Sequence, residues 1–135
     1  AEIGYISVLN LTAEEDKSRV KLLDNLAASI YKQGEEANLL KEYKMAADHF
    51  LRVGKLAPQS KIRATAEYDA AAALIKLEDW DRTADVLKAF RINFQNHKLQ
   101  PDVTKKIAFV YRSAGKLELA AAEYERIERE SKDES

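Results

Sequence analysis

The chain has 135 residues, of which 46% are hydrophobic and 33% are charged, and its formal net charge is −1. These values suit one folded, helix-rich domain, and no stretch is long and apolar enough to predict a membrane span. The chain has no cysteine, which excludes disulfides, thiolate metal sites and cysteine nucleophiles together.

Charge is unevenly distributed along the chain. Residues 1–40 and 117–135 have net charges of −3 and −4, whereas residues 41–116 have a net charge of +6. A solvated, mixed-charge helical surface accounts for this pattern, because a nucleic-acid site would need a denser basic stripe and a more basic total. Weak RNA binding is kept as an alternative that would depend steeply on salt. It would use Lys98, Lys105, Lys106 and Arg112.

The N-terminal part is predicted as an apolar segment followed by a long helix. Residues 1–11 alternate loosely and could be a short extended or frayed segment, or the tail of a preceding helix. Thr12 and Glu15 fit a capping box. After them, apolar residues at three- and four-residue steps predict a helix over about residues 13–40 that could bend near Gly34.

Five shorter helices are predicted after the long one, and turn residues separate them. Pro58 cannot continue a helix, Pro101 suits a first helical position, and Gly115 suits a turn. The expected spans are about residues 43–56, 60–77, 79–95, 101–114 and 116–131. Residues 132–135 are polar and are expected to form a disordered tail.

Apolar and small residues recur along these helices at a spacing of 37 residues. A fixed period in this range is the signature of stacked helical repeats, whereas a plain helical bundle predicts no fixed period. The recurring apolar positions, expected to be buried, are Tyr43, Trp80 and Leu117; Phe50, Leu87 and Tyr124; and Val53, Phe90 and Ile127. The small positions are Gly34, Ala71 and Ala108, and Ala46, Thr83 and Ala120.

This register resembles the tetratricopeptide repeat family, whose unit of about 34 residues is a pair of helices. The resemblance covers about residues 27–130 and implies an all-α fold, a right-handed α-solenoid of antiparallel helix pairs. About three repeats would follow an extended N-terminal helix. Thr83 replaces the Ala that the family prefers, and proline follows only the first unit. These departures and the longer period leave the helix boundaries and the superhelical twist open.

The resemblance also divides the chain into parts. A single repeat domain is expected over residues 12–131, between the apolar segment 1–11 and the tail 132–135. Its units would span about residues 27–63, 64–100 and 101–131.

Residues that carry catalysis or bind metals are sparse. His49 and His97 stand 48 residues apart, and neither has the converging ligands that a metal site needs. No Gly-rich phosphate loop and no nucleophile elbow is present. Trp80 shares the register of Tyr43 and Leu117, which favours packing over ligand binding. We therefore expect no enzyme activity, no metal and no cofactor.

In the resembled family, the first helices of successive pairs line a concave groove. The matched positions predict a groove for a peptide or partner protein, in which aromatic rings lie beside cations, as in many binding hot spots. The predicted residues are Tyr31, Glu35, Asn38, Tyr68, Lys76, Lys105, Phe109 and Arg112. The clamp by which some family members grip a terminal carboxylate is absent, because Tyr31 and Glu35 replace its Lys and Asn.

The sequence therefore predicts a non-catalytic protein–protein interaction scaffold. The alternative is a structural or self-assembly module, or a fragment of a larger repeat protein, and a homo-oligomer stays open. Residues 47–53 and 79–80 also look like bacterial cell-envelope repeat proteins, among them the periplasmic partner of the Tol–Pal system and outer-membrane assembly lipoproteins. This resemblance slightly favours the periplasm or cell envelope over the cytoplasm and leaves the compartment open.

Overall fold

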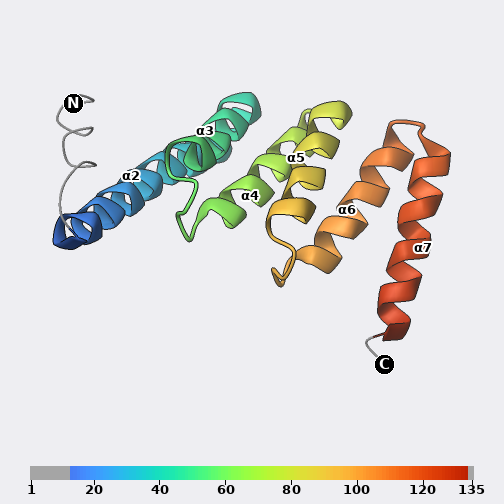
Figure 1. Cartoon of the computed structure of the whole chain (residues 1–135). Coiled ribbons are helices and arrows are strands. Elements are labelled where there is room, and N and C mark those ends of the chain that lie inside the picture. The colour runs from blue at the N-terminus through green and yellow to red at the C-terminus, as the bar shows by residue number, and fades with distance from the viewer. Residues whose placement is uncertain (1–12, 134–135) are drawn as a thin grey trace.

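The computed structural model describes residues 13–133, and every regular element within them is a helix (Figure 1). This confirms the all-α prediction. The helices are α2 (Ala13–Leu39), α3 (Tyr43–Leu56), α4 (Arg63–Lys76), α5 (Trp80–Asn93), α6 (Gln100–Ser113) and α7 (Leu117–Asp133). The apolar segment 1–11 and the capping residue Thr12 lie outside the described residues.

The helix boundaries lie close to the predicted ones. α2 continues unbroken past Gly34. α4 begins at Arg63 rather than at residue 60, because a turn precedes it in which the Ser60 hydroxyl accepts a hydrogen bond from the Ile62 backbone N–H (3.3 Å). α7 extends to Asp133, two residues into the segment predicted as a tail.

Three of the turns between helices share one backbone conformation. Lys41, Glu78 and Gly115 have φ values of 60°, 57° and 79°, which is the left-handed region. In each turn the backbone N–H of the next residue bonds to a carbonyl five residues back, for example Glu42 to Ala37 at 2.9 Å. This pattern closes a helix C-terminus and favours glycine at the left-handed position, so Lys41 and Glu78 carry backbone strain.

We expect Lys41→Gly and Glu78→Gly each to raise the free energy of unfolding by about 0.5–1 kcal/mol, because glycine adopts a positive φ without strain. Urea denaturation measures the change. Ala89→Gly is the matched control. Ala89 is an exposed residue of α5, and its replacement by glycine should lower the free energy of unfolding by about 1 kcal/mol. If Lys41→Gly also destabilised the protein, the proposed strain would be refuted.

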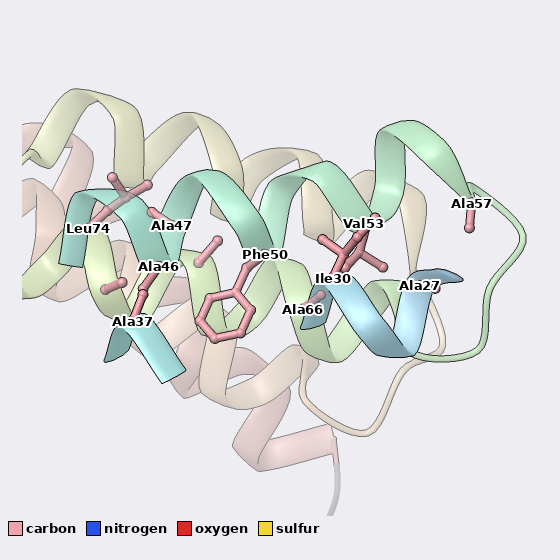
Figure 2. Packing of buried hydrophobic residues seen from close by; sticks show 12 residues of the cluster. Ala27, Ile30, Ala37, Ala46, Ala47, Phe50, Val53, Ala57, Ala66 and Leu74 are labelled. Carbon is pink, nitrogen blue, oxygen red and sulfur yellow. The ribbon is translucent and has the colours of Figure 1, made fainter. Parts of the chain in front are cut away.

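Each helix packs against the next one along the chain, and Figure 1 shows them in a row from α2 to α7. The first of two buried clusters joins α2, α3 and α4 around Phe50, which is 2% exposed and projects among small side chains (Figure 2). The second joins α4 to α7 around Leu87 and Phe90. α4 supplies residues to both clusters, so its alanine-rich sequence lets helices approach on two sides.

Of the nine recurring apolar positions, four are buried and three are half-buried, but two in α7 are exposed. Leu117 is 66% exposed and Tyr124 is 44% exposed, so the prediction that they belong to the core was wrong. The equivalent face of α3 is covered by α4, and that of α5 by α6. No described helix covers this face of α7.

Thr83, Trp80 and Gly34 each have a structural explanation. The buried Thr83 satisfies its hydroxyl by donating to the Asp79 carbonyl at 2.6 Å. Trp80 is half-buried and meets the Phe109 ring edge-on, with 5.9 Å between ring centroids. Gly34 is needed for close packing, because an added Cβ would lie 2.6 Å from the Phe50 ring.

Candidate functional site

One cavity is lined by residues of α2, α3 and α4, and another by residues of α4 and α6. The α2–α4 pocket has a volume of about 380 Å³. It is lined by Tyr31, Glu35, Asn38, Leu39, Tyr43, Phe50, Asp69, Ala72, Ala73 and Lys76. The α4–α6 pocket has a volume of about 340 Å³. It is lined by Ile75, Asp102, Lys105, Lys106 and Phe109.

Six of the eight residues predicted for the groove line these two pockets. The α2–α4 pocket contains four of them, Tyr31, Glu35, Asn38 and Lys76. The α4–α6 pocket contains Lys105 and Phe109. Tyr68 and Arg112 flank the second pocket: the Tyr68 hydroxyl bonds to Asp102, and the Arg112 guanidinium lies 5.9 Å from the centre of the Phe109 ring.

Two tyrosine–aspartate hydrogen bonds connect the helices that carry the pockets. Tyr31 of α2 donates its hydroxyl to the Asp69 carboxylate of α4, and Tyr68 of α4 donates to the Asp102 carboxylate of α6. The sequence analysis did not single out Asp69. Tyr31 and Asp69 are 38 residues apart, whereas Tyr68 and Asp102 are 34 residues apart, so a search at one fixed period does not find both pairs. An Asp about one repeat after each Tyr would have been the signal.

These pairs shift the pKa values of their members. Burial raises the pKa of Tyr31 and of Tyr68 above the usual value near 10, and the hydrogen bond to the carboxylate and its negative charge raise each further. Burial also raises the pKa of Asp69, while the hydrogen bond from Tyr31 lowers it in part. The fold therefore favours the protonated phenols.

We expect this preference to make stability fall in alkaline solution. A group whose folded pKa is raised stabilises the fold below its unfolded pKa, here about 10, and loses that effect as the pH rises through its folded pKa. The free energy of unfolding should therefore fall above about pH 10. The fall should be shallower in Tyr31→Phe/Tyr68→Phe, as urea denaturation at several pH values would show. Tyr124→Phe, at an exposed tyrosine, should follow the wild type; an equal slope in all three proteins would contradict the expectation.

Several charged groups of the two pockets are free to meet a ligand. Within residues 13–133, the carboxylate of Glu35 and the ammonium groups of Lys76 and Lys105 form no ion pair and no hydrogen bond with another side chain. Phe109 beside them is 39% exposed. The pockets thus combine apolar surface with unpaired charge.

The two histidines have local structural contacts. His97 accepts a hydrogen bond from the Leu99 backbone N–H at 3.1 Å and packs edge-on against Phe90, and His49 lies 3.4 Å from the Arg52 guanidinium. In the part of the chain that the structure describes, no three His, Asp or Glu side chains converge as metal ligands would. None of the helices from α2 to α7 combines the length and the hydrophobicity of a membrane span.

Comparisons with protein-family models, with curated proteins and with solved structures found no match to this chain. The repeat units of the chain can still be compared with one another, so that each pocket is set beside the equivalent position in the next unit.

Proposed function

We propose that this chain is a non-catalytic scaffold that binds a peptide or a partner protein along the face formed by α2, α4 and α6. One observation carries the proposal: the α4–α6 pocket places the exposed Phe109 ring beside Lys105 and Arg112, neither of which forms an ion pair with a described residue. An accessible aromatic ring next to a cation is typical of a binding hot spot. This end of the face suits a peptide segment with apolar and acidic side chains.

We further propose that the helix pairs form a right-handed solenoid of the tetratricopeptide type. Support comes from equivalent positions with equivalent surroundings. The three left-handed turn residues, Lys41, Glu78 and Gly115, are spaced by the 37-residue period. The second helix of each pair also buries a small residue at one register, and these residues are Ala46, Thr83 and Ala120. Stacked units of this kind present extended binding surfaces.

Selection from a random peptide library tests the binding proposal. Peptides that bind the wild type should bind Phe109→Ala/Arg112→Ala at least about tenfold more weakly, which corresponds to about 1.4 kcal/mol. Fluorescence anisotropy with labelled peptides measures the affinities, and a thermal melt checks that the variant is folded, because Phe109 also contacts Trp80.

The matched control is Lys88→Ala/Ile92→Ala. Both residues are exposed on α5. Lys88 is a cation like Arg112, and Ile92 is a large apolar residue like Phe109. Binding should be unchanged in this control. Equal weakening in both double variants, or none in either, would refute the assignment of the face.

A second candidate function is assembly with another copy, favoured by Leu117 and Tyr124 of α7, which are exposed and, seven residues apart, share one helix face. Contiguous exposed apolar residues mark contact sites when the patch is large. Sedimentation velocity over a range of concentrations tests this function. A strict monomer would exclude it, and a concentration-dependent dimer that Tyr124→Glu abolishes would support it.

A further inference from the structure

The second tyrosine–aspartate pair is completed by a cation from the chain itself. The Lys106 ammonium lies 3.6 Å from the Asp102 carboxylate, which accepts the Tyr68 hydroxyl. The same ammonium lies 5.4 Å from the centre of the Tyr68 ring. Lys106 therefore gains an ion pair and a cation–π contact together.

The first pair has the same tyrosine and carboxylate but no such cation from residues 13–133. Lys106 is four residues after Asp102, and the residue four after Asp69 is Ala73. Ala73 lines the α2–α4 pocket. Beside the Tyr31–Asp69 pair there is therefore a cavity of about 380 Å³, at the position that Lys106 occupies beside the Tyr68–Asp102 pair. The half-buried Asp69 has its hydrogen bond from Tyr31 but forms no ion pair with a described residue.

The other groups that line this pocket also suit a cation. The rings of Tyr31, Tyr43 and Phe50 contribute to its walls, and those of Tyr31 and Phe50 are 5.2 Å apart. Aromatic faces attract ammonium and guanidinium groups. The Glu35 carboxylate adds a second negative charge close enough to affect the Tyr31 hydroxyl.

We infer that the α2–α4 pocket accepts a lysine or arginine side chain of the bound peptide, held between the Tyr31–Asp69 pair and Glu35 as Lys106 is held by Tyr68 and Asp102. This inference rests on the proposed peptide-binding function. A cation in this pocket and an acidic or apolar side chain in the α4–α6 pocket would fix the direction in which the peptide lies.

Among the described residues that line the pocket, Lys76 is the one basic group, and it opposes the incoming cation. Its ammonium forms no ion pair with Asp69 or Glu35, so it leaves the place beside Asp69 open. Removal of its charge should strengthen the binding of a cationic side chain, since like charges in one site repel.

Short capped peptides with one central side chain test the inference without a natural partner. The probes are acetyl-Gly-Ser-Xaa-Ser-Gly-amide with lysine, arginine, norleucine or glutamate at the centre, added to labelled protein and followed by amide chemical shifts in NMR. The lysine and arginine probes should shift amides around Tyr31 and Asp69 and should bind at least about tenfold more tightly than the norleucine probe. Equal binding by norleucine, or no shifts with any probe at millimolar concentration, would overturn the inference.

Variants at the pocket sharpen this test. Asp69→Asn and Glu35→Gln should each lower the affinity for the lysine probe several-fold, and Lys76→Gln should raise it. Glu35 is exposed, so its variant stays informative if Asp69→Asn fails to fold. If Asp69→Asn and Glu35→Gln both bind the lysine probe as tightly as the wild type does, the assignment of the pocket is overturned.

Lys106→Ala provides a reciprocal test, because it removes the resident cation at a partly exposed position. It should open a second site, so that the lysine probe also shifts amides around Tyr68 and Asp102. No new shifts in this variant would count against the comparison of the two pairs.

Two further outcomes separate the possible failures. n-Butylamine offers the lysine side chain with its single ammonium but without a peptide, and tighter binding by n-butylamine than by the lysine probe would overturn the choice of a peptide ligand. If the lysine probe binds, but the selected peptides bind Phe109→Ala/Arg112→Ala as tightly as the wild type, the proposed function is refuted and the cation pocket is supported. If selected peptides need Phe109 and Arg112 and the lysine probe does not bind, only the cation pocket fails.

Discussion

Phe50→Ala should lower the free energy of unfolding by about 3–5 kcal/mol, the range for phenylalanine truncated in a packed core. Phe50 is 2% exposed and belongs to the cluster that joins α2, α3 and α4, so the cavity left behind would border three helices. Urea denaturation followed by circular dichroism measures the loss. Because a small domain is stable by only about 5–15 kcal/mol, the variant should unfold at a much lower urea concentration.

Tyr124→Ala is the matched control for this prediction. Tyr124 occupies the register of Phe50 in the third unit but is 44% exposed. Its truncation should therefore cost less than about 1 kcal/mol, since surface substitutions have small effects. Equal losses at the two positions would show that a helix covers α7 in solution and would contradict the structure of this end.

Glu123→Ala should cost about 2 kcal/mol, because it leaves Arg91 partly buried without its partner. The two side chains are 13% and 19% exposed, and the Arg91 guanidinium donates two hydrogen bonds to the Glu123 carboxylate, at 2.7 and 3.2 Å. This pair joins α5 to α7. Amide hydrogen exchange should therefore accelerate in α7 of the variant more than in α2.

Glu128→Ala provides the comparison. Glu128 pairs with Lys132 at 3.2 Å on the surface of the same helix, and the two side chains are 69% and 75% exposed. Exposed pairs of this kind contribute little, so this variant should match the wild type in stability and exchange. A large loss here, or none in Glu123→Ala, would show that burial does not decide the strength of these ion pairs.

The sequence predicted the helices well because their signals are local. Apolar residues at three- and four-residue steps mark one face of a helix. Pro58 and Gly115 lie between helices, and Pro101 lies in the first turn of α6. Four of the eight predicted groove residues line one pocket and two line the next. These residues came from positions matched to the resembled family, whose register places such side chains on a common face.

The features that sequence reasoning missed depend on which helix covers which. Tyr124 matched Phe50 and Leu87 in register, but burial requires a covering helix, and the periodicity cannot show that α7 has none among the described residues. The partnership of Tyr31 with Asp69 likewise depends on the offset between two packed helices. That offset differs between the two pairs, so no fixed spacing predicts it.

The packing of each helix on its neighbours in the chain has a consequence for folding. The main contacts join helices that follow one another, and the connecting turns are short, so little loop entropy must be lost before contacts form. Such low contact order goes with rapid folding. Structure can then begin in any adjacent pair of helices and spread outward, and it should be lost first from the two ends of the row, where α2 and α7 each pack mainly against one neighbouring helix.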